Sequence, residues 1–160
     1  MSTHTGTARG IHEENWQPVL ELAIEEVFEI MLGCKVTPAK DSGVVVKGEF
    51  TAMIGLAGAL CGILTIRCDA ETARQIARSM LGDTAESEDQ VSDALGEVCN
   101  MVAGNFKNKL AGTDERCMLS VPSVVSGGEY TFHSLAEGNA IEAALIFQGA
   151  PVMVRLQLQN

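Results

Sequence analysis

Apolar residues recur every three or four positions in two long segments of the chain, which is the spacing of one face of an α-helix. The first predicted helix covers about residues 15–32. The second begins with a capping box at Ser87 and Gln90 and runs to about residue 110. A shorter helix is predicted to begin at the N-cap Asp69. The apolar side of the first helix comprises Trp16, Val19, Leu20, Ala23, Val27, Ile30 and Met31, and that of the second comprises Val91, Leu95, Val98, Cys99, Val102, Phe106 and Leu110.

Stretches rich in Val, Ile and Thr predict strands before and after the second long helix. The run from Phe50 to Ile66 carries no charge, but glycines interrupt it. A hairpin that turns near Gly58 is therefore favoured over a membrane-spanning helix of about 17–25 residues. Consecutive strands joined by short turns form a mostly antiparallel sheet, so we expect an α/β fold of the α+β type, with two long helices and one short helix packed on the sheet. The predicted strands cover residues 43–56, 60–67, 117–125, 130–134, 140–147 and 152–158.

Length and charge restrict the class of protein. The 160 residues are interpreted as a flexible tail over residues 1–11 and a single domain over residues 12–160. A formal net charge of -10 disfavours nucleic acid and anionic membranes as partners, although it permits a basic patch on another protein. The cysteines form no CxxC pair, which indicates reduced, buried thiols rather than a zinc site. Because the amino terminus also lacks the apolar core of a signal peptide, the protein is predicted to be cytoplasmic.

Four residues of the second long helix form a stripe of unusual composition. Asp93, Glu97, Asn100 and Gly104 fall within an arc of about 60°, opposite the apolar side. Asn is a mediocre helix former, and Gly within a helix costs about 1 kcal/mol relative to Ala. An exposed glycine also lets another backbone come close. The residue types by themselves leave two interpretations open, a functional surface and an ordinary solvated face.

The same segment resembles the active-site helix of the CheC/CheX/FliY family of chemotaxis phosphatases. The family pattern is Asp or Ser, three residues, Glu, two residues and Asn, which Asp93, Glu97 and Asn100 match. The family also carries a proline about twenty-two positions beyond the Asn, where Pro122 stands in this chain. The amino-terminal helix has no second Glu-x-x-Asn pair, so the sequence is most similar to the single-site CheX branch.

The resemblance implies a substrate, the phosphoaspartate of a CheY-like response regulator receiver domain. An acyl phosphate is already activated, so its hydrolysis needs a water held in line more than it needs a strong base. Asn100 is implied to orient this water and Glu97 to dock the lysine of the receiver. Asp93 and Gly104 are implied to belong to the partner-binding surface, and Pro122 to shape a neighbouring loop. The receiver is expected to supply Mg²⁺, and the chain is expected to need no cofactor or metal of its own.

An alternative function is a non-catalytic module that binds a receiver domain, as in the related flagellar switch proteins. The pair of Glu97 and Asn100 favours hydrolysis, because a pure binder has no need of the asparagine. The resemblance further implies a homodimer that forms through sheet edges. The sequence does not identify the receiver, nor does it distinguish chemotaxis from another two-component pathway.

Overall fold

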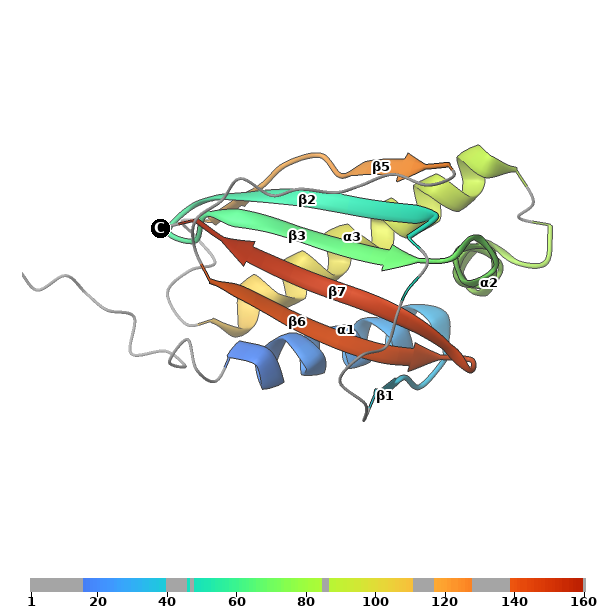
Figure 1. Cartoon of the computed structure of the whole chain (residues 1–160), viewed down its shortest axis with the longest axis horizontal. Helices are drawn as coiled ribbons and strands as arrows, with labels where there is room; N and C mark the ends of the chain where they lie inside the picture. The colour runs from blue at the N-terminus through green and yellow to red at the C-terminus, as the bar shows by residue number, and fades with distance from the viewer. Residues whose placement is uncertain are drawn as a thin grey trace, which may run out of the picture.

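The computed structural model is a sheet with helices on one face, and it describes residues 16–39, 46, 48–84, 87–110, 117–127 and 139–159 (Figure 1). All strand pairs are antiparallel, in the order β1-β6-β7-β3-β2-β4, and β5 pairs with β2. The predicted α+β class is confirmed. The helices are α1 (Trp16–Leu32), α2 (Ala70–Leu81) and α3 (Glu88–Lys109). The strands are β1 (Thr37–Pro38), β2 (Phe50–Gly58), β3 (Gly62–Cys68), β4 (Cys117–Leu119), β5 (Ser123–Ser126), β6 (Ala140–Phe147) and β7 (Ala150–Leu158).

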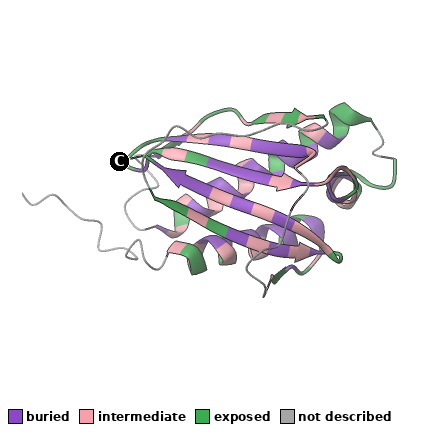
Figure 2. Ribbon diagram, in the orientation of Figure 1, coloured by how far each residue is buried: buried purple, intermediate pink, exposed green. Residues whose placement is uncertain are grey.

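The core lies between the sheet and the helices. Alternate residues along the central strands are buried in the core, because successive side chains of a strand point to opposite faces (Figure 2). Thr51, Thr65 and Gln157, which lie between them, are buried as well. The predicted apolar side of α3 is buried from Val91 to Leu110. Phe106 of this helix also meets Trp16 of α1 edge-on, with ring centroids 6.2 Å apart. The two long helices and the sheet therefore share one apolar core.

The buried side of α1 differs from the predicted one. Ile24 and Phe28 are fully buried, whereas Ile30 and Met31 are exposed by 77% and 45%. Phe28 packs edge-on against Phe147 of β6, with ring centroids 5.3 Å apart. Because α1 carries apolar residues around much of its circumference, its periodicity is compatible with more than one buried face, and packing against β6 selects one of them.

Both predicted helix starts are confirmed by their capping bonds. The hydroxyl oxygen of Ser87 accepts from the amide of Gln90 at 3.1 Å, and the Gln90 side chain accepts from the Ser87 amide at 3.2 Å. The carboxylate of Asp69 accepts from the Thr72 amide at 2.7 Å. These caps satisfy amide groups that have no partner within the helix.

The uncharged run forms the predicted hairpin of β2 and β3, and Gly58 at its turn has a φ of 115°. No described helix is long and apolar enough to cross a membrane. Strand β2 begins at Phe50, and residues 43–45 of the predicted longer strand lie outside the described residues. The strand predicted over 130–134 and the tail predicted over 1–11 also lie outside them.

The prediction of one continuous strand over residues 117–125 is wrong, because the chain forms β4 and β5 with a break between them. Pro122 lies in this break and has no amide hydrogen for a sheet ladder. Ser120 holds the chain to β2 in another way. Its amide donates to the Gly55 carbonyl at 2.9 Å, and its hydroxyl oxygen accepts from the Gly55 amide at 2.8 Å.

One extra residue is accommodated in this break. The register pairs Leu119 with Leu56 and Ser123 with Met53. Three residues of the edge segment therefore face two residues of β2, which is the residue count of a β-bulge. Val121, the middle one of the three, is 86% exposed. The bulge thus presents an apolar side chain to solvent at the edge of the sheet.

The thiols are less uniformly buried than predicted. Cys68, Cys99 and Cys117 are buried, Cys34 is half-buried and Cys61 is exposed; all of them are free. Burial raises the pKa of Cys68 and of Cys99 to about 12, so both thiols stay protonated at neutral pH. The sequence context of Cys61 is apolar, but the residue follows the tip of the β2–β3 hairpin, where its neighbours do not cover it.

A polar contact joins the two long helices at the edge of the core. The side-chain amide of Asn105 donates to the Ala23 carbonyl at 3.2 Å and to the Glu26 carboxylate at 2.9 Å. The Lys109 ammonium lies 2.8 Å from the same carboxylate. Hydrogen bonds from Lys109 and Asn105 hold the pKa of Glu26 below its ordinary value of 4.5. Asn105 therefore has a structural role next to the candidate site.

We expect Glu26→Gln to lower the melting temperature at pH 7 by a few degrees at most, because the carboxylate is partly exposed. A lowered pKa in the folded state stabilises the fold above the unfolded value near 4.5, and this stabilisation is lost as the pH falls through the folded pKa. The difference between wild type and variant should therefore shrink below about pH 4.5. Thermal denaturation followed by circular dichroism from pH 3 to 8 measures it. Glu29→Gln, at an exposed position of the same helix, is the matched control, and an equal effect of both changes would contradict the prediction.

Candidate functional site

Helix α3 and the edge segment 119–126 run side by side in opposite directions. At one end, the Ser126 hydroxyl donates to the Glu88 carboxylate at 2.7 Å. At the other end, the Leu119 side chain lies 4.0 Å from the place where a Cβ atom on Gly104 would be. The sixteen residue steps from Glu88 to Gly104 rise by about 24 Å along the helix, and the seven steps from Leu119 to Ser126 span about 23 Å of extended chain. The two elements are therefore matched in length and stay adjacent from end to end.

Gly96 faces the edge segment at the middle of this contact. A Cβ atom at this buried position would lie 3.5 Å from Val124 and 3.8 Å from Pro122, which is ordinary van der Waals distance. A larger side chain would push the segment away from the helix. Gly96 was not among the predicted site residues, since a glycine within an apolar helix gives no sign of which element approaches it.

A hollow of about 480 Å³ opens between the two elements. Its helix side carries the exposed carboxylates of Asp93 and Glu97. Its other side is apolar, and includes the exposed Val121. The hollow, called the α3 groove below, is lined by Ser92, Asp93, Gly96, Glu97, Val121, Pro122 and Val124. The structure thus brings Asp93, Glu97 and Pro122 together, although Pro122 is distant from the helix in sequence.

Asn100 and Gly104 continue the same stripe of α3. Asn100 lies one turn beyond Glu97, about 4.5 Å further along the axis, and is half-buried. Within the described residues, no hydrogen bond or ion pair involves the side chains of Asp93, Glu97 or Asn100. Gly104 is half-buried beside Leu119, so a partner that approaches it also meets this side chain.

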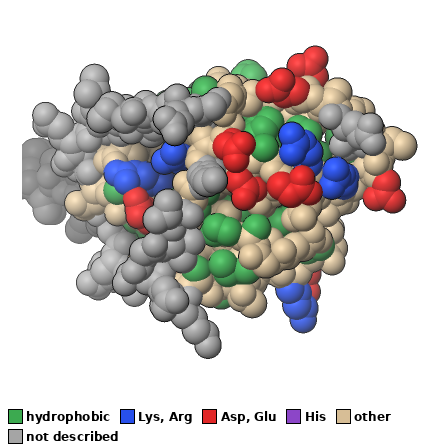
Figure 3. Space-filling view, turned by 45° about the vertical axis from the view of Figure 1, so that its right-hand side comes forward, with side chains coloured by type: hydrophobic (Ala, Val, Ile, Leu, Met, Phe, Trp, Pro, Cys, Tyr) green, Lys and Arg blue, Asp and Glu red, His purple; other side chains and the backbone are tan. Residues whose placement is uncertain are grey.

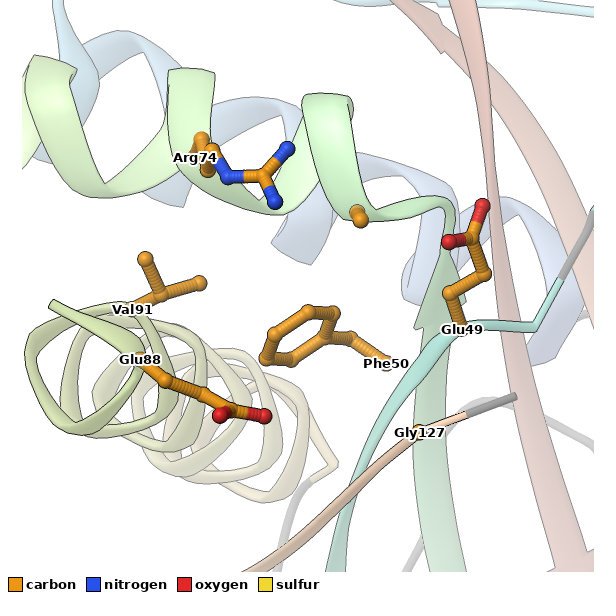
Figure 4. A pocket seen from close by; sticks show the side chains of 7 residues that line it. Glu49, Phe50, Arg74, Glu88, Val91 and Gly127 are labelled. Atoms are coloured by element: carbon orange, nitrogen blue, oxygen red, sulfur yellow. The ribbon is translucent and has the colours of Figure 1, made fainter. Parts of the chain in front are cut away.

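A second hollow, of about 290 Å³, lies where the first turn of α3 meets α2 and the start of β2 (Figure 4). Its walls combine the Arg74 guanidinium with the carboxylates of Glu49 and Glu88, around the ring of Phe50. Acidic and basic side chains also lie close together on the face shown in Figure 3. Because its charges are mixed and it contains none of the predicted site residues, this hollow is not the candidate site. Glu88 instead anchors the edge segment through Ser126.

No group of three or more His, Cys, Asp or Glu residues within the described ranges is arranged to hold a metal ion. The chemistry available in the α3 groove is that of two carboxylates and a neighbouring amide. A carboxylate accepts hydrogen bonds and attracts cations, whereas the amide both donates and accepts. This combination can bind a basic group and orient a water molecule.

The groove also contains residues that the sequence pattern did not indicate. Val121 and Val124 read as members of a continuous strand, whose outward residues are commonly solvated. Pro122 inside that predicted strand was the available sign of a bulge. The position of Pro122 relative to Glu97 depends on the pairing of β4 and β5 with β2, which the local sequence does not specify.

Known proteins are similar to this chain in sequence and in fold. The CheY-P phosphatase CheX of Thermotoga maritima is 27% identical over 99 residues, which are 61% of this chain and 64% of that protein. The chain thus covers less than two thirds of the length of that relative. The chemotaxis protein CheX of Vibrio vulnificus has a TM-score of 0.77 at 26% identity, over 90% of this chain and 96% of that one.

A crystal structure of a CheX–CheY–BeF3–Mg²⁺ complex from Borrelia burgdorferi shows the same fold. The match has a TM-score of 0.70 at 23% identity, and covers 91% of this chain and 98% of that chain. The family model described as chemotaxis phosphatase CheX matches residues 50–144, a range that includes all of α3 and Pro122. Because this match extends over more than half of the sequence, the chain belongs to the chemotaxis phosphatase CheX family.

Proposed function

We propose that the protein is a phosphatase that hydrolyses the phosphoaspartate of a CheY-like receiver domain. The observation that carries this proposal is the pair of Glu97 and Asn100 on the outer side of α3, next to the groove. Neither side chain is used in a hydrogen bond or ion pair within the described residues, so both are available to a partner. Membership of the CheX family supports the same activity.

In this mechanism Asn100 holds the attacking water. The amide does not take up a proton at neutral pH, so Asn100 is not a general base. Its oxygen accepts a hydrogen bond from the water and its nitrogen donates to the phosphoryl group, which places the water in line with the bond that breaks. Because an acyl phosphate is already reactive, such positioning and charge stabilisation supply the catalysis.

Glu97 and Asp93 supply the negative charge of the docking surface. Glu97 is proposed to pair with the active-site lysine of the receiver, which fixes the distance between Asn100 and the phosphoryl group. The receiver is proposed to carry the Mg²⁺, as the CheX–CheY complex from Borrelia burgdorferi contains this ion together with CheY. Gly104 is proposed to let the receiver come close to α3, and Pro122 to shape the neighbouring loop.

A module that binds a receiver without hydrolysis is the competing function. Release of inorganic phosphate from an aspartyl-phosphorylated receiver, with and without this protein, separates the two. A phosphatase accelerates phosphate release even when its concentration is far below that of the receiver. A binding module leaves the rate unchanged or slows it, and this outcome would contradict the proposal.

We expect Asn100→Ala to lower the single-turnover rate by roughly 10²-fold or more, the scale of losing one contact to the transition state. Asn100→Asp should be almost as damaging, because it loses the NH₂ donor and places a negative charge beside the phosphoryl group. Rapid-quench measurement of a phosphorylated receiver gives these rates. Asn108→Ala, on the same helix but outside the groove, serves as the control. Full activity of the Asp variant with an unchanged melting temperature would contradict the role of Asn100.

Glu97→Ala should chiefly weaken docking. Loss of a charge-assisted contact costs about 1.5–3 kcal/mol, so KM should rise more than kcat falls. The two constants are obtained from steady-state hydrolysis over a range of receiver concentrations. Glu29→Ala removes an exposed carboxylate from α1 as the matched control. Equal losses of kcat in the Glu97 and Asn100 variants at saturating receiver would refute this division of roles.

A homodimer through a sheet edge is also proposed. The edge that contains β4 carries Met118 with 75% of its surface exposed, and the opposite edge is the two-residue strand β1. Backbone groups of an edge strand that have no partner within the sheet can pair with a second copy. We expect light scattering at tens of micromolar to give the mass of a dimer. A monomer at that concentration would count against the edge pairing.

A further inference from the structure

We propose that the α3 groove binds a second basic side chain of the receiver, a lysine or arginine other than the active-site lysine assigned to Glu97. This inference rests on the phosphatase function proposed above. It makes Asp93 and Val121 determinants of which receiver is accepted.

The helix side of the groove has a negative charge that is not neutralised within the described residues. Asp93 and Glu97 are both exposed and have no ion pair there. The lysines at the far end of α3 are engaged elsewhere, because Lys107 donates to the Cys117 carbonyl at 2.9 Å and Lys109 pairs with Glu26. Such a surface is complementary to a cation on another molecule.

The opposite side of the groove identifies the kind of cation. Val121, Pro122 and Val124 are apolar, and Val121 is 86% exposed. A bare metal ion gains nothing from such a wall. Lysine and arginine, in contrast, bury their aliphatic stems on apolar surfaces while the charged group stays at a polar one. The stem is therefore placed against Val121 and the charged group at the carboxylate of Asp93.

Both walls are held in place before a partner arrives. The bonds of Ser120 to Gly55 and of Ser126 to Glu88 fix the two ends of the edge segment. Its middle lies beside Gly96, where an added Cβ atom would be 3.5 Å from Val124. A preformed groove loses little conformational entropy when it binds a side chain, which favours a specific contact over a diffuse attraction.

The test uses the receiver domains encoded by the source organism, each phosphorylated with acetyl phosphate. For the receivers that wild type dephosphorylates, Asp93→Asn should raise KM about fivefold, the upper range for an exposed ion pair. Val121→Lys should raise it at least as much, because the new ammonium occupies the groove. The KM of Asp93→Asn should also depend less on NaCl concentration than that of wild type.

Two charge-matched control variants and a double-mutant analysis make the test specific to the groove. Glu29→Gln removes an equal charge from α1, and Val125→Lys adds an equal charge at an exposed position of β5 outside the groove. A scan of surface lysines and arginines of the receiver to alanine should find one position whose effect on KM is not additive with Asp93→Asn. The active-site lysine should instead be coupled to Glu97.

The possible results separate the groove proposal from the proposed phosphatase function. Suppose that wild type hydrolyses the phosphoaspartate but the groove variants have the same KM values as the controls. This result would overturn the groove proposal and leave the phosphatase function standing. Coupling of Asp93 to the active-site lysine alone would overturn the second basic residue. If wild type dephosphorylates none of the receivers, the proposed function and the occupant of the groove both fail.

Discussion

The β-bulge between β4 and β5 is the constraint on which the site depends. Three residues of the edge segment face two residues of β2, and Ser120 bonds to Gly55 where the ladder is interrupted. A regular strand would alternate its side chains between the core and the open face. The additional residue instead places Val121 at the rim, next to the polar side of α3. Without the bulge, the apolar wall of the α3 groove would lack its most exposed member, Val121.

Helix α3 serves the core and the site with opposite sides. Its apolar side is buried against the sheet and α1, so the helix has little freedom to rotate or slide. The capping box at Ser87 and the bond of Glu88 to Ser126 fix its amino-terminal end. Its other end is joined to α1 through Asn105. The stripe from Asp93 to Asn100 is thus carried by one of the most firmly held elements of the protein, which suits positioning chemistry.

The composition of the site fits a substrate that brings its own reactivity. The proposed catalysis needs no strong base, so an amide is sufficient to orient water and carboxylates are needed only for docking. A surface with uncompensated negative charge attracts the basic rim of a partner and repels anionic surfaces. The acidic balance of the whole chain extends this preference beyond the groove. In the proposed function, charge selects the class of partner and the shape of the groove selects within that class.

The sequence by itself determined the helices with their caps, the α+β class and the stripe that contains Glu97 and Asn100, because each depends on residues a few positions apart. The sequence did not predict the buried face of α1, because that face depends on the packing of Phe28 on the distant Phe147. It also predicted one strand in place of β4 and β5, because the break between them depends on the bond of Ser120 to the distant Gly55. The α3 groove also depends on contacts between segments that are distant in the sequence. Val121 lies next to Glu97 only because both segments contact the central strands, so the tertiary structure alone decided that a polar stripe would become one wall of a hollow.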